Sequence, residues 1–327
     1  MSVRLHHTAT MRIRLITPAP PRSRTGNRTT AARWAAILRR LGHRVEVSVD
    51  YQGEPADLMV ALHAWRSATA IARFAEDCPG CPLVVALTGT DAYRFIHSHP
   101  EETLRSIALA DRLVGLHRCI ADTVPAEHRA KVRVIYQSAL PIPRRAPARR
   151  AFRVCVAGHL RDEKDPLRPA YAVRDLPPGS RLRVDQFGMA HSPEWAAAAA
   201  AEMAANPRYR WHGEVAPGRL RRAYGSAHLL VLPSRMEGGA NVISEAVVAG
   251  LPVVASRIPG SIGLLGKEYP GFYPVEDTQA LRALLLRAES DLAFYGRLES
   301  ACAACRDLFL PERERAGWED LLRELTT

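Results

Sequence analysis

The segment at residues 233–256, PSRMEGGANVISEAVVAGLPVVAS, has the residue types of a phosphate-binding turn. Gly238 and Gly239 follow an apolar run and directly precede residues that favour a helix, so backbone N–H groups are accessible at the helix start. Such N–H groups, aided by the helix dipole, bind anions. We therefore expect a diphosphate against the amides of the residues that open the helix, namely Ala240, Asn241 and Val242.

Two carboxylates flank this turn: Glu237 stands before it, and Glu245 lies about two turns later on the predicted helix. Glu237 can accept hydrogen bonds from sugar hydroxyls, and Glu245 can accept them from the paired hydroxyls of a ribose. Diphosphate, sugar and ribose together indicate a nucleoside-diphosphate sugar as the ligand. The alternative is an ordinary capped helix start with one solvent-facing glutamate.

The elements that must position these residues are those of an α/β protein. Short apolar runs alternate with helical stretches, which is typical of βα units and a parallel sheet. The predicted strands of the first half are residues 12–17, 44–49, 57–62, 82–87, 112–116 and 131–136, and a helix is predicted at 28–42. The predicted strands of the second half are residues 152–158, 181–188, 209–213, 227–234 and 251–256.

A stretch rich in proline and arginine separates the two halves. We expect a Rossmann-like domain at residues 11–140, a linker at 141–150, a second Rossmann-like domain at 151–305, and a C-terminal helix at 306–327 that returns to the first domain. Two doubly wound domains facing a central cleft would hold ligands at the carboxyl ends of their strands. Both Met1 and Met11 are possible starts, and the first ten residues are expected to be disordered.

Composition limits the classes of partner. The net charge of +11 is compatible with nucleic acid, but the arginines are scattered without an aromatic-interleaved basic stripe, so we expect no nucleic acid. An anionic small substrate would account for part of the excess. No apolar run approaches the roughly 20 residues of a membrane-spanning helix. There is no apolar signal segment either, so we expect a cytoplasmic protein without stable membrane insertion. The oligomeric state stays open.

Four of the six cysteines form two CxxC pairs, CPGC at residues 78–81 and CAAC at 302–305. Such pairs can bind zinc or act in redox chemistry. These pairs, however, lie in different halves, and Cys302 and Cys305 fall in an alanine-rich helical stretch where cysteine is commonly a packing residue. We therefore expect no metal and no other cofactor, and the role of Cys78 and Cys81 stays open.

The segment at 233–256 resembles the donor site of the GT-B glycosyltransferases of family 4. These enzymes carry two glutamates with seven residues between them, as Glu237 and Glu245 do here, followed by EAxxxGxPVVAS. The resemblance spans most of the chain. It implies a GT-B fold and transfer of a sugar from a nucleoside-diphosphate sugar. We find no D-x-D motif after a strand, the motif with which GT-A enzymes hold a metal.

The same resemblance extends to AGHLRDEKDP at residues 157–166. Family members have a glycine after the first strand of the donor domain and then a basic pair that contacts the diphosphate. Here the glycine is Gly158 and the second basic position is Lys164. The first basic position falls on His159, where the family usually has arginine, and Arg161 is the alternative source of charge. The resemblance thus implies catalytic roles for Lys164 and Arg161 beside that of Glu237.

In the first half, the loop PAPPRSRTGNRTTAARW at residues 18–34 stands where family members bind the acceptor. Arg22, Arg24 and Arg28 could surround an anion, and the helix start would assist them. The residues implied as acceptor ligands are those that open the helix, Gly26, Asn27, Arg28 and Thr29. The alternative is a mobile loop with a threonine-rich cap.

A second motif, TGTDAY at residues 88–93, stands where related enzymes often read H-G-T-D. The histidine of that motif touches the donor sugar, but Thr88 replaces it here, so this contact does not carry over. Asp91 remains a catalytic candidate, and Thr90 and His63 are candidates for acceptor binding. A histidine at a strand end is also commonly structural.

A narrower resemblance joins the segments TPAPPRSRTGNRTTAARWAAILRRLGHRV, ALTGTDAY, AGHLRDEKDP and EGGANVISEA to the selenosugar synthases of selenoneine biosynthesis. It implies that UDP-N-acetylglucosamine and selenophosphate react to a 1-seleno-sugar, with release of UDP and phosphate. One alternative is a family 4 glycosyltransferase with a hydroxyl acceptor such as a polyol, a lipid or a glycan. Another is a nucleotide-sugar-binding protein without turnover.

Overall fold

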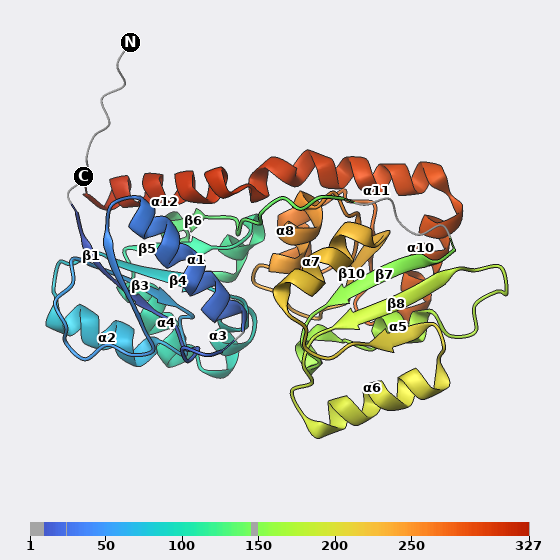
Figure 1. The fold of residues 1–327 in the computed structure, drawn as a ribbon. Helices are drawn as coiled ribbons and strands as arrows, with labels where there is room; N and C mark the ends of the chain where they lie inside the picture. Colours follow the sequence, from blue (N-terminus) through green and yellow to red (C-terminus); the bar gives the residue numbers. More distant parts are fainter. Residues whose placement is uncertain (1–9, 24, 145–149, 327) are drawn as a thin grey trace, which may run out of the picture. The chain divides into compact units, whose positions relative to one another are not determined.

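The computed structural model describes residues 10–23, 25–144 and 150–326 of the chain (Figure 1). The expectation of disorder at the N-terminus concerns residues almost entirely outside this part. The expected anion contact of Arg24 and the linker residues 145–149 also lie outside it.

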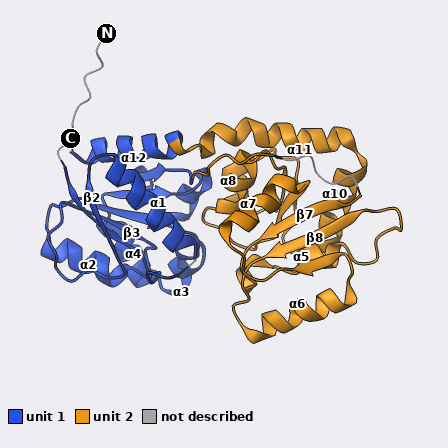
Figure 2. Ribbon diagram, viewed as in Figure 1, with its two compact units in different colours: residues 1–137, 312–327 blue, residues 138–311 orange. Residues whose placement is uncertain are grey.

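The chain divides into two compact units (Figure 2). Unit 1 contains the residues up to Gln137 and those from Glu312 onward, and unit 2 contains Ser138–Pro311. Between Ser138 and Arg144 the described backbone has neither helix nor strand. Among the described residues, no helix combines the length and the apolar character needed to cross a membrane.

Unit 1 is built on a six-stranded sheet with the order β2-β1-β3-β4-β5-β6. All neighbours pair in parallel, so the carboxyl ends of the strands meet at one edge of the sheet. The central strands β3 and β4 are buried at every position, as expected for strands covered on both faces. The strands are β1 (Arg12–Ile16), β2 (Arg44–Ser48), β3 (Leu58–Leu62), β4 (Leu83–Leu87), β5 (Arg112–Gly115) and β6 (Val132–Val134).

Helices cover both faces of this sheet. One apolar cluster joins the sheet to α1 and α12, and a second cluster on other sheet residues includes side chains of α2 and α4. The α-helices of unit 1 are α1 (Gly26–Arg40), α2 (Ala68–Asp77), α3 (Ile96–Ser98), α4 (Pro100–Leu109) and α12 (Pro311–Thr326). Short helical turns occupy η1 (Asp91–Phe95), η2 (Arg118–Thr123) and η3 (Ala126–Lys131).

Unit 2 repeats this architecture, with a six-stranded parallel sheet in the order β12-β11-β10-β7-β8-β9. Its strands are β7 (Phe152–Ala157), β8 (Leu182–Phe187), β9 (Tyr209–Trp211), β10 (Leu229–Leu232), β11 (Val253–Ser256) and β12 (Phe272–Tyr273). Its α-helices are α5 (Arg168–Ala172), α6 (Pro193–Ala205), α7 (Pro217–Ser226), α8 (Asn241–Val248), α9 (Pro259–Leu265), α10 (Thr278–Ser290) and α11 (Leu292–Cys305). The turns η4 (Asp162–Lys164) and η5 (Arg306–Phe309) complete unit 2.

The two parallel sheets with helices confirm the predicted α/β class and the two Rossmann-like domains of the GT-B fold. Each predicted strand is present, with ends shifted by a few residues at most. The helix expected at 28–42 begins two residues earlier, at Gly26, and ends at Arg40. Strand β12 and helices α2, α3, α4, α5, α7, α9 and α10 had no prediction.

The C-terminal helix α12 packs in unit 1 through its apolar face. Trp318 lies edge-on against Trp34 of α1, with ring centroids 4.8 Å apart. Beside this pair, the carboxylate of Glu314 is almost fully buried and accepts a hydrogen bond of 2.8 Å from Trp34 Nε1. Arg33 Nε lies 3.1 Å from the same oxygen, so the buried charge is compensated. Helix α12 is thus held in unit 1 by a hydrogen-bonded ion pair with a buried carboxylate, in addition to apolar packing.

We predict that Glu314→Ala lowers the free energy of unfolding by about 3 kcal/mol, because it leaves the Trp34 N–H and the Arg33 guanidinium without their acceptor. Urea denaturation followed by tryptophan fluorescence measures this change. Asp320→Ala, at an exposed position of the same helix, is the control and should cost less than about 0.5 kcal/mol. Equal effects of the two substitutions would contradict the structural role of Glu314.

Candidate functional site

The turn between β10 and α8 forms the first part of the candidate site in unit 2. It contains Gly238 and Gly239, and α8 begins at Asn241. The residue before the helix is Ala240, whose methyl group cannot cap the helix and is buried. The start of α8 is therefore suited to an anion that takes the place of a capping side chain. Val242, in the first turn, is half-buried.

Glu237 is held in this turn by two hydrogen bonds to the same carboxylate oxygen. Lys164 Nζ lies 2.5 Å from Glu237 Oε1, and Ser234 Oγ donates to Oε1 over 2.6 Å. Ser256, at the end of β11, donates to the carbonyl of Ser234 over 2.5 Å. Glu237 is 9% exposed and Ser234 and Ser256 are fully buried. The chain of contacts fixes the Glu237 carboxylate and directs the Lys164 ammonium to it.

A second set of contacts ties the loop after β7 to the loop after β10. The amide of Arg235 donates to the carbonyl of Glu163 over 2.9 Å. The Arg235 side chain donates to the carbonyl of Asp162 over 3.1 Å and forms an ion pair of 2.6 Å with Glu276. Together with the pair of Lys164 and Glu237, which are 73 residues apart in the sequence, these contacts join the two loops.

The other basic positions of the loop after β7 differ in charge. Burial, and then the neighbouring His191, lower the pKa of His159, so its imidazole is neutral at pH 7. His159 Nδ1 accepts a hydrogen bond from the amide of Met189 over 3.2 Å. Arg161 Nε is buried, finds no hydrogen-bond partner among the described residues, and lies 3.9 Å from Glu163 Oε2. Arg161 therefore carries the charge that His159 does not.

Two glycines allow the backbone at the carboxyl ends of the strands to approach closely. A Cβ atom on Gly188 would lie 2.0 Å from the carbonyl oxygen of Gly158, and Gly188 has a φ of +144°. A Cβ atom on Gly260, at the start of α9, would lie 2.2 Å from the carbonyl oxygen of Glu237. Sequence reasoning missed Gly188 and Gly260, because only the fold shows which segments they touch.

Glu245 lies on α8 and is half-buried. Burial, and next the charge of Glu245, raise the pKa of Tyr224 on α7 well above its usual value. Burial also raises the pKa of Cys155 on β7, with smaller contributions from Asp185 and Glu245. The Glu245 carboxylate is therefore close enough to α7 and β7 to act on their side chains.

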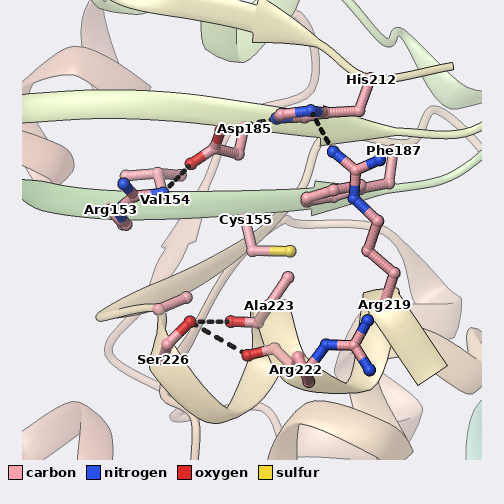
Figure 3. A pocket seen from close by; sticks show the side chains of 11 residues that line it. Arg153, Val154, Cys155, Asp185, Phe187, His212, Arg219, Arg222, Ala223 and Ser226 are labelled. Carbon is pink, nitrogen blue, oxygen red and sulfur yellow. Dashed lines mark hydrogen bonds and ion pairs between the residues drawn. The ribbon is translucent and has the colours of Figure 1, made fainter. Parts of the chain in front are cut away.

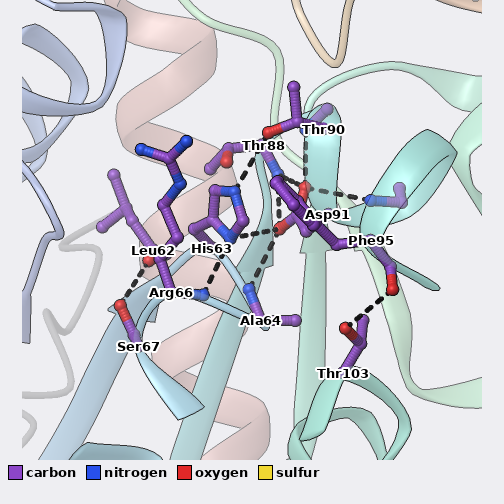
Figure 4. A network of polar contacts seen from close by, with 12 residues as sticks. Leu62, His63, Ala64, Arg66, Ser67, Thr88, Thr90, Asp91, Phe95 and Thr103 are labelled. Carbon is purple, nitrogen blue, oxygen red and sulfur yellow. Dashed lines mark hydrogen bonds and ion pairs between the residues drawn. The ribbon is translucent and has the colours of Figure 1, made fainter. Parts of the chain in front are cut away.

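In unit 1, Asp91 organises the carboxyl ends of β3 and β4 (Figure 4). Its carboxylate accepts backbone N–H groups from both loops, over 3.0 Å from Ala64, 2.9 Å from Thr88 and 2.7 Å from Gly89. Asp91 is fully buried. The carboxylate thereby holds the two loops together, and the catalytic role expected of Asp91 stays a prediction.

His63 and Thr90 meet in the same network. Arg66 donates its backbone N–H to His63 Nδ1 over 3.1 Å, so the ring proton sits on Nε2 and is donated to Thr90 Oγ1 over 3.0 Å. Burial lowers the pKa of His63 although Asp91 opposes this shift. His63 is 2% exposed and has a φ of +78°, an uncommon backbone conformation for a side chain of its size.

The start of α1, the predicted acceptor loop, carries a buried cationic atom. Arg28 Nη1 is buried and makes no hydrogen bond within the described part of the chain, and the same holds for Thr17 Oγ1 directly after β1. Gly26 and Asn27 form the first turn of α1, and Thr29 Oγ1 lies 3.3 Å from the carbonyl of Thr25. Buried polar atoms without partners are uncommon and point to a missing ligand or water.

An aromatic group next to His63 was also missed from the sequence. Trp65 stacks on Phe95 with ring centroids 4.0 Å apart and lies 4.4 Å from the ring of His99. The signal would have been an aromatic residue three positions after a strand end, which is too common a pattern to be specific.

The two CxxC pairs lie in different units. Cys78 and Cys81 bring their Sγ atoms to 2.6 Å, and Cys302 Sγ lies 3.2 Å from the hydroxyl of Tyr269. In the part of the chain that is described, no group of three or more His, Cys, Asp or Glu side chains is arranged to hold a metal ion.

We predict that Gly260→Ala lowers the free energy of unfolding by about 1–3 kcal/mol, because the new methyl group meets the backbone of Glu237 rather than a flexible side chain. Gly296→Ala, in α11 with open space around the position, is the matched control and should stabilise the protein by about 0.5–1 kcal/mol. Urea denaturation measures both. A neutral effect of Gly260→Ala would show that the Glu237 turn is not held as described.

Three comparisons relate the chain to known proteins. Residues 151–291 match the family model described as Glycosyl transferases group 1. A search of curated proteins gives no match. Among solved structures, HepE from Anabaena in complex with UDP and glucose has 16% identity and a TM-score of 0.74, over 96% of this chain and 100% of that one.

Two further structures are similar over nearly the whole chain. Sucrose-phosphate synthase from Thermosynechococcus elongatus has 16% identity and a TM-score of 0.77, over 96% of this chain and 99% of that one. A glycosyltransferase from Rickettsia africae has 13% identity and a TM-score of 0.70, over 98% and 100%. At these identities the likeness shows a common fold. The chain therefore has the GT-B fold, and its residues 151–291 match the family described as Glycosyl transferases group 1.

Proposed function

We propose that unit 2 binds a UDP-sugar with its diphosphate against the start of α8 and beside Lys164. The observation that carries this proposal is the ion pair of Lys164 and Glu237, 2.5 Å long, next to a helix start that has no capping side chain. Two sources of positive potential, an ammonium and helix amides, thus adjoin one turn. HepE, which has the same fold, was crystallised with UDP and glucose, and this supports the UDP-sugar class.

The two glutamates would then contact the two ends of the donor. Both hydrogen bonds of Glu237 go to Oε1, so Oε2 is the oxygen that we assign to the hydroxyls of the transferred sugar. Glu245 is assigned to the ribose hydroxyls. Arg161 adds positive charge near the diphosphate. His159 is neutral and adds no charge there. Lys164, Arg161 and the α8 amides stabilise the departing UDP without a resident metal in this proposal.

For the acceptor we propose selenophosphate, bound at the start of α1 in unit 1. The buried Nη1 of Arg28 and the buried hydroxyl of Thr17 offer hydrogen bonds that no described residue accepts. A small anion with several acceptor oxygens would satisfy these donors and use the positive end of α1. The choice of selenophosphate over other anions, and of N-acetylglucosamine as the sugar, follows from the sequence resemblance to selenosugar synthases.

The proposed reaction proceeds in two bond changes. A selenium lone pair forms the bond to C1 of the sugar while the bond from C1 to the diphosphate oxygen breaks and its electron pair leaves with UDP. Water then cleaves the selenium–phosphorus bond and releases phosphate and the 1-seleno-sugar. A soft, anionic selenium atom needs no deprotonation, so in this proposal neither the amide-bound carboxylate of Asp91 nor the neutral His63 has to act as a base.

We expect that the purified protein, UDP-N-acetylglucosamine and selenophosphate give UDP, phosphate and a product with the mass of the 1-seleno-sugar. Mass spectrometry of a panel of UDP-sugars, each with selenophosphate or with glycerol as a hydroxyl acceptor, measures the outcome. Turnover with glycerol but not with selenophosphate would remove the acceptor assignment and leave the donor assignment in place. UDP release without any acceptor product would indicate donor hydrolysis only.

The role of Lys164 is tested by UDP affinity. We expect Lys164→Met to weaken UDP binding about tenfold or more, because a charge-assisted hydrogen bond to phosphate is lost. Lys267→Met is the matched control, since Lys267 is an exposed lysine of the same unit outside the site. Isothermal titration calorimetry gives both dissociation constants. Unchanged affinity in Lys164→Met, or an equal loss in Lys267→Met, would rule out the proposed contact.

A further inference from the structure

A cavity of about 220 Å³ lies in unit 2 between α7 and the sheet (Figure 3). Its apolar wall includes Cys155 of β7 and Phe187 of β8, both buried. Its polar wall holds arginines from the sheet and from α7. The lining residues include neither Gly158 to Lys164 nor the turn before α8, so this cavity differs from the proposed donor site.

A chain of polar contacts runs along one wall of the cavity. Arg153 Nη1 lies 3.3 Å from Asp185 Oδ2, and His212 Nε2 lies 2.7 Å from Asp185 Oδ1. Arg219 Nη2 lies 3.3 Å from His212 Nδ1. Arginine can only donate, so Nδ1 accepts and the imidazole proton sits on Nε2 and points to Asp185. The Asp185 carboxylate therefore has two donors, Arg153 and His212.

The charges that line the cavity do not balance. Arg153, Arg219 and Arg222 contribute three positive charges, and Asp185 is the single carboxylate of the lining. Arg222 forms no ion pair with a described residue, and in Figure 3 its guanidinium stands on α7 across from the strands. An excess of two positive charges matches a dianion. Two guanidinium groups on one helix would repel each other less once a dianion lies between them and Arg153.

Size and shape narrow the class of ligand. A volume of 220 Å³ exceeds the roughly 30 Å³ share of a single water several times, so the cavity can hold a phosphate group together with a small ring. The ring of Phe187 stacks on His212 with an interplanar angle of 8° and centroids 4.7 Å apart, which gives the cavity a flat apolar side. One guanidinium group can donate two parallel hydrogen bonds to two oxygens of a phosphate. A neutral sugar would leave the positive charges of the arginines uncompensated.

We propose that this cavity is a second ligand site, which binds a phosphate dianion, either as the phosphate monoester of a small sugar or as free phosphate. The bound phosphate lies between Arg222 on α7 and Arg153 on β7. It thereby fastens α7 to the sheet. The residues that line this site include none of those assigned to the donor.

The test is calorimetric titration of the full chain, at constant ionic strength, with inorganic phosphate, glucose 6-phosphate or glucose. Each titration is run without UDP and with saturating UDP. We expect both phosphate compounds to bind, glucose not to bind, and UDP to leave their affinities unchanged within about twofold. Tighter binding of glucose 6-phosphate than of phosphate identifies the monoester as the ligand, and equal binding identifies free phosphate. Displacement of phosphate by UDP would overturn the proposal.

Two variants of α7 distinguish specific binding in the cavity from the general attraction of an anion to surface charge. We expect Arg222→Ser to weaken phosphate binding about tenfold or more, since a charged hydrogen bond is lost. Arg221→Ser removes the same charge from the neighbouring position of α7, where the side chain contacts the carbonyl of Pro141 instead of the cavity. It should change the affinity less than about twofold by loss of screened surface charge alone. Equal effects of the two variants would overturn the proposal.

A third variant shows whether the effect of Arg222→Ser comes from the lost charge or from a disturbed helix α7. Arg153→Ser alters β7 and leaves the helix sequence intact, and we expect a loss of phosphate affinity similar to that of Arg222→Ser. Unchanged affinity in Arg153→Ser would contradict a site shared by sheet and helix. Because UDP affinity is measured in parallel, a protein that binds phosphate but not UDP would refute the donor proposal only, and the reverse result would refute this inference only.

Discussion

The ion pair between Lys164 and Glu237 is the interaction on which the candidate donor site depends. It joins the loop after β7 to the loop after β10. Ser234 donates to the same carboxylate oxygen, and Ser256 donates to the carbonyl of Ser234. Without Glu237, the ammonium of Lys164 would lose the partner that holds it at the turn before α8. Gly260 lets the backbone of α9 approach this turn closely, so the position of the carboxylate is determined by packing as well as by charge.

In unit 1 a carboxylate also holds loops together, but its partners are backbone amides instead of a lysine. There the buried carboxylate of Asp91 accepts backbone amides from the loops after β3 and β4, and His63 and Thr90 are positioned around it. In both units a carboxylate thus fixes loops at the carboxyl edge of a parallel sheet. The difference is that Glu237 is 9% exposed and has a lysine as partner, whereas Asp91 is fully buried and its partners are backbone N–H groups.

The local features of the fold and the site could be predicted from the sequence, and the long-range ones could not. The glycines before Asn241 and the apolar runs of the strands signal the helix start and the sheets, because these signals lie within a few residues. The place of Lys164 at the donor site came only from a family resemblance, and its contact with Glu237 was not predicted, since nothing in either segment specifies the other. The enclosure of Asp91, the neutrality of His159 and the approach of Gly260 depend on neighbours distant in sequence, so they required the structure.

The most direct test of the central claim is a crystal structure of the protein with UDP bound. The account predicts that oxygens of the diphosphate lie within about 3.2 Å of backbone N–H groups in the first turn of α8 and of Lys164 Nζ, with the ribose hydroxyls at the carboxylate of Glu245. A nucleotide bound elsewhere on unit 2, with its phosphates out of hydrogen-bonding reach of both α8 and Lys164, would contradict it.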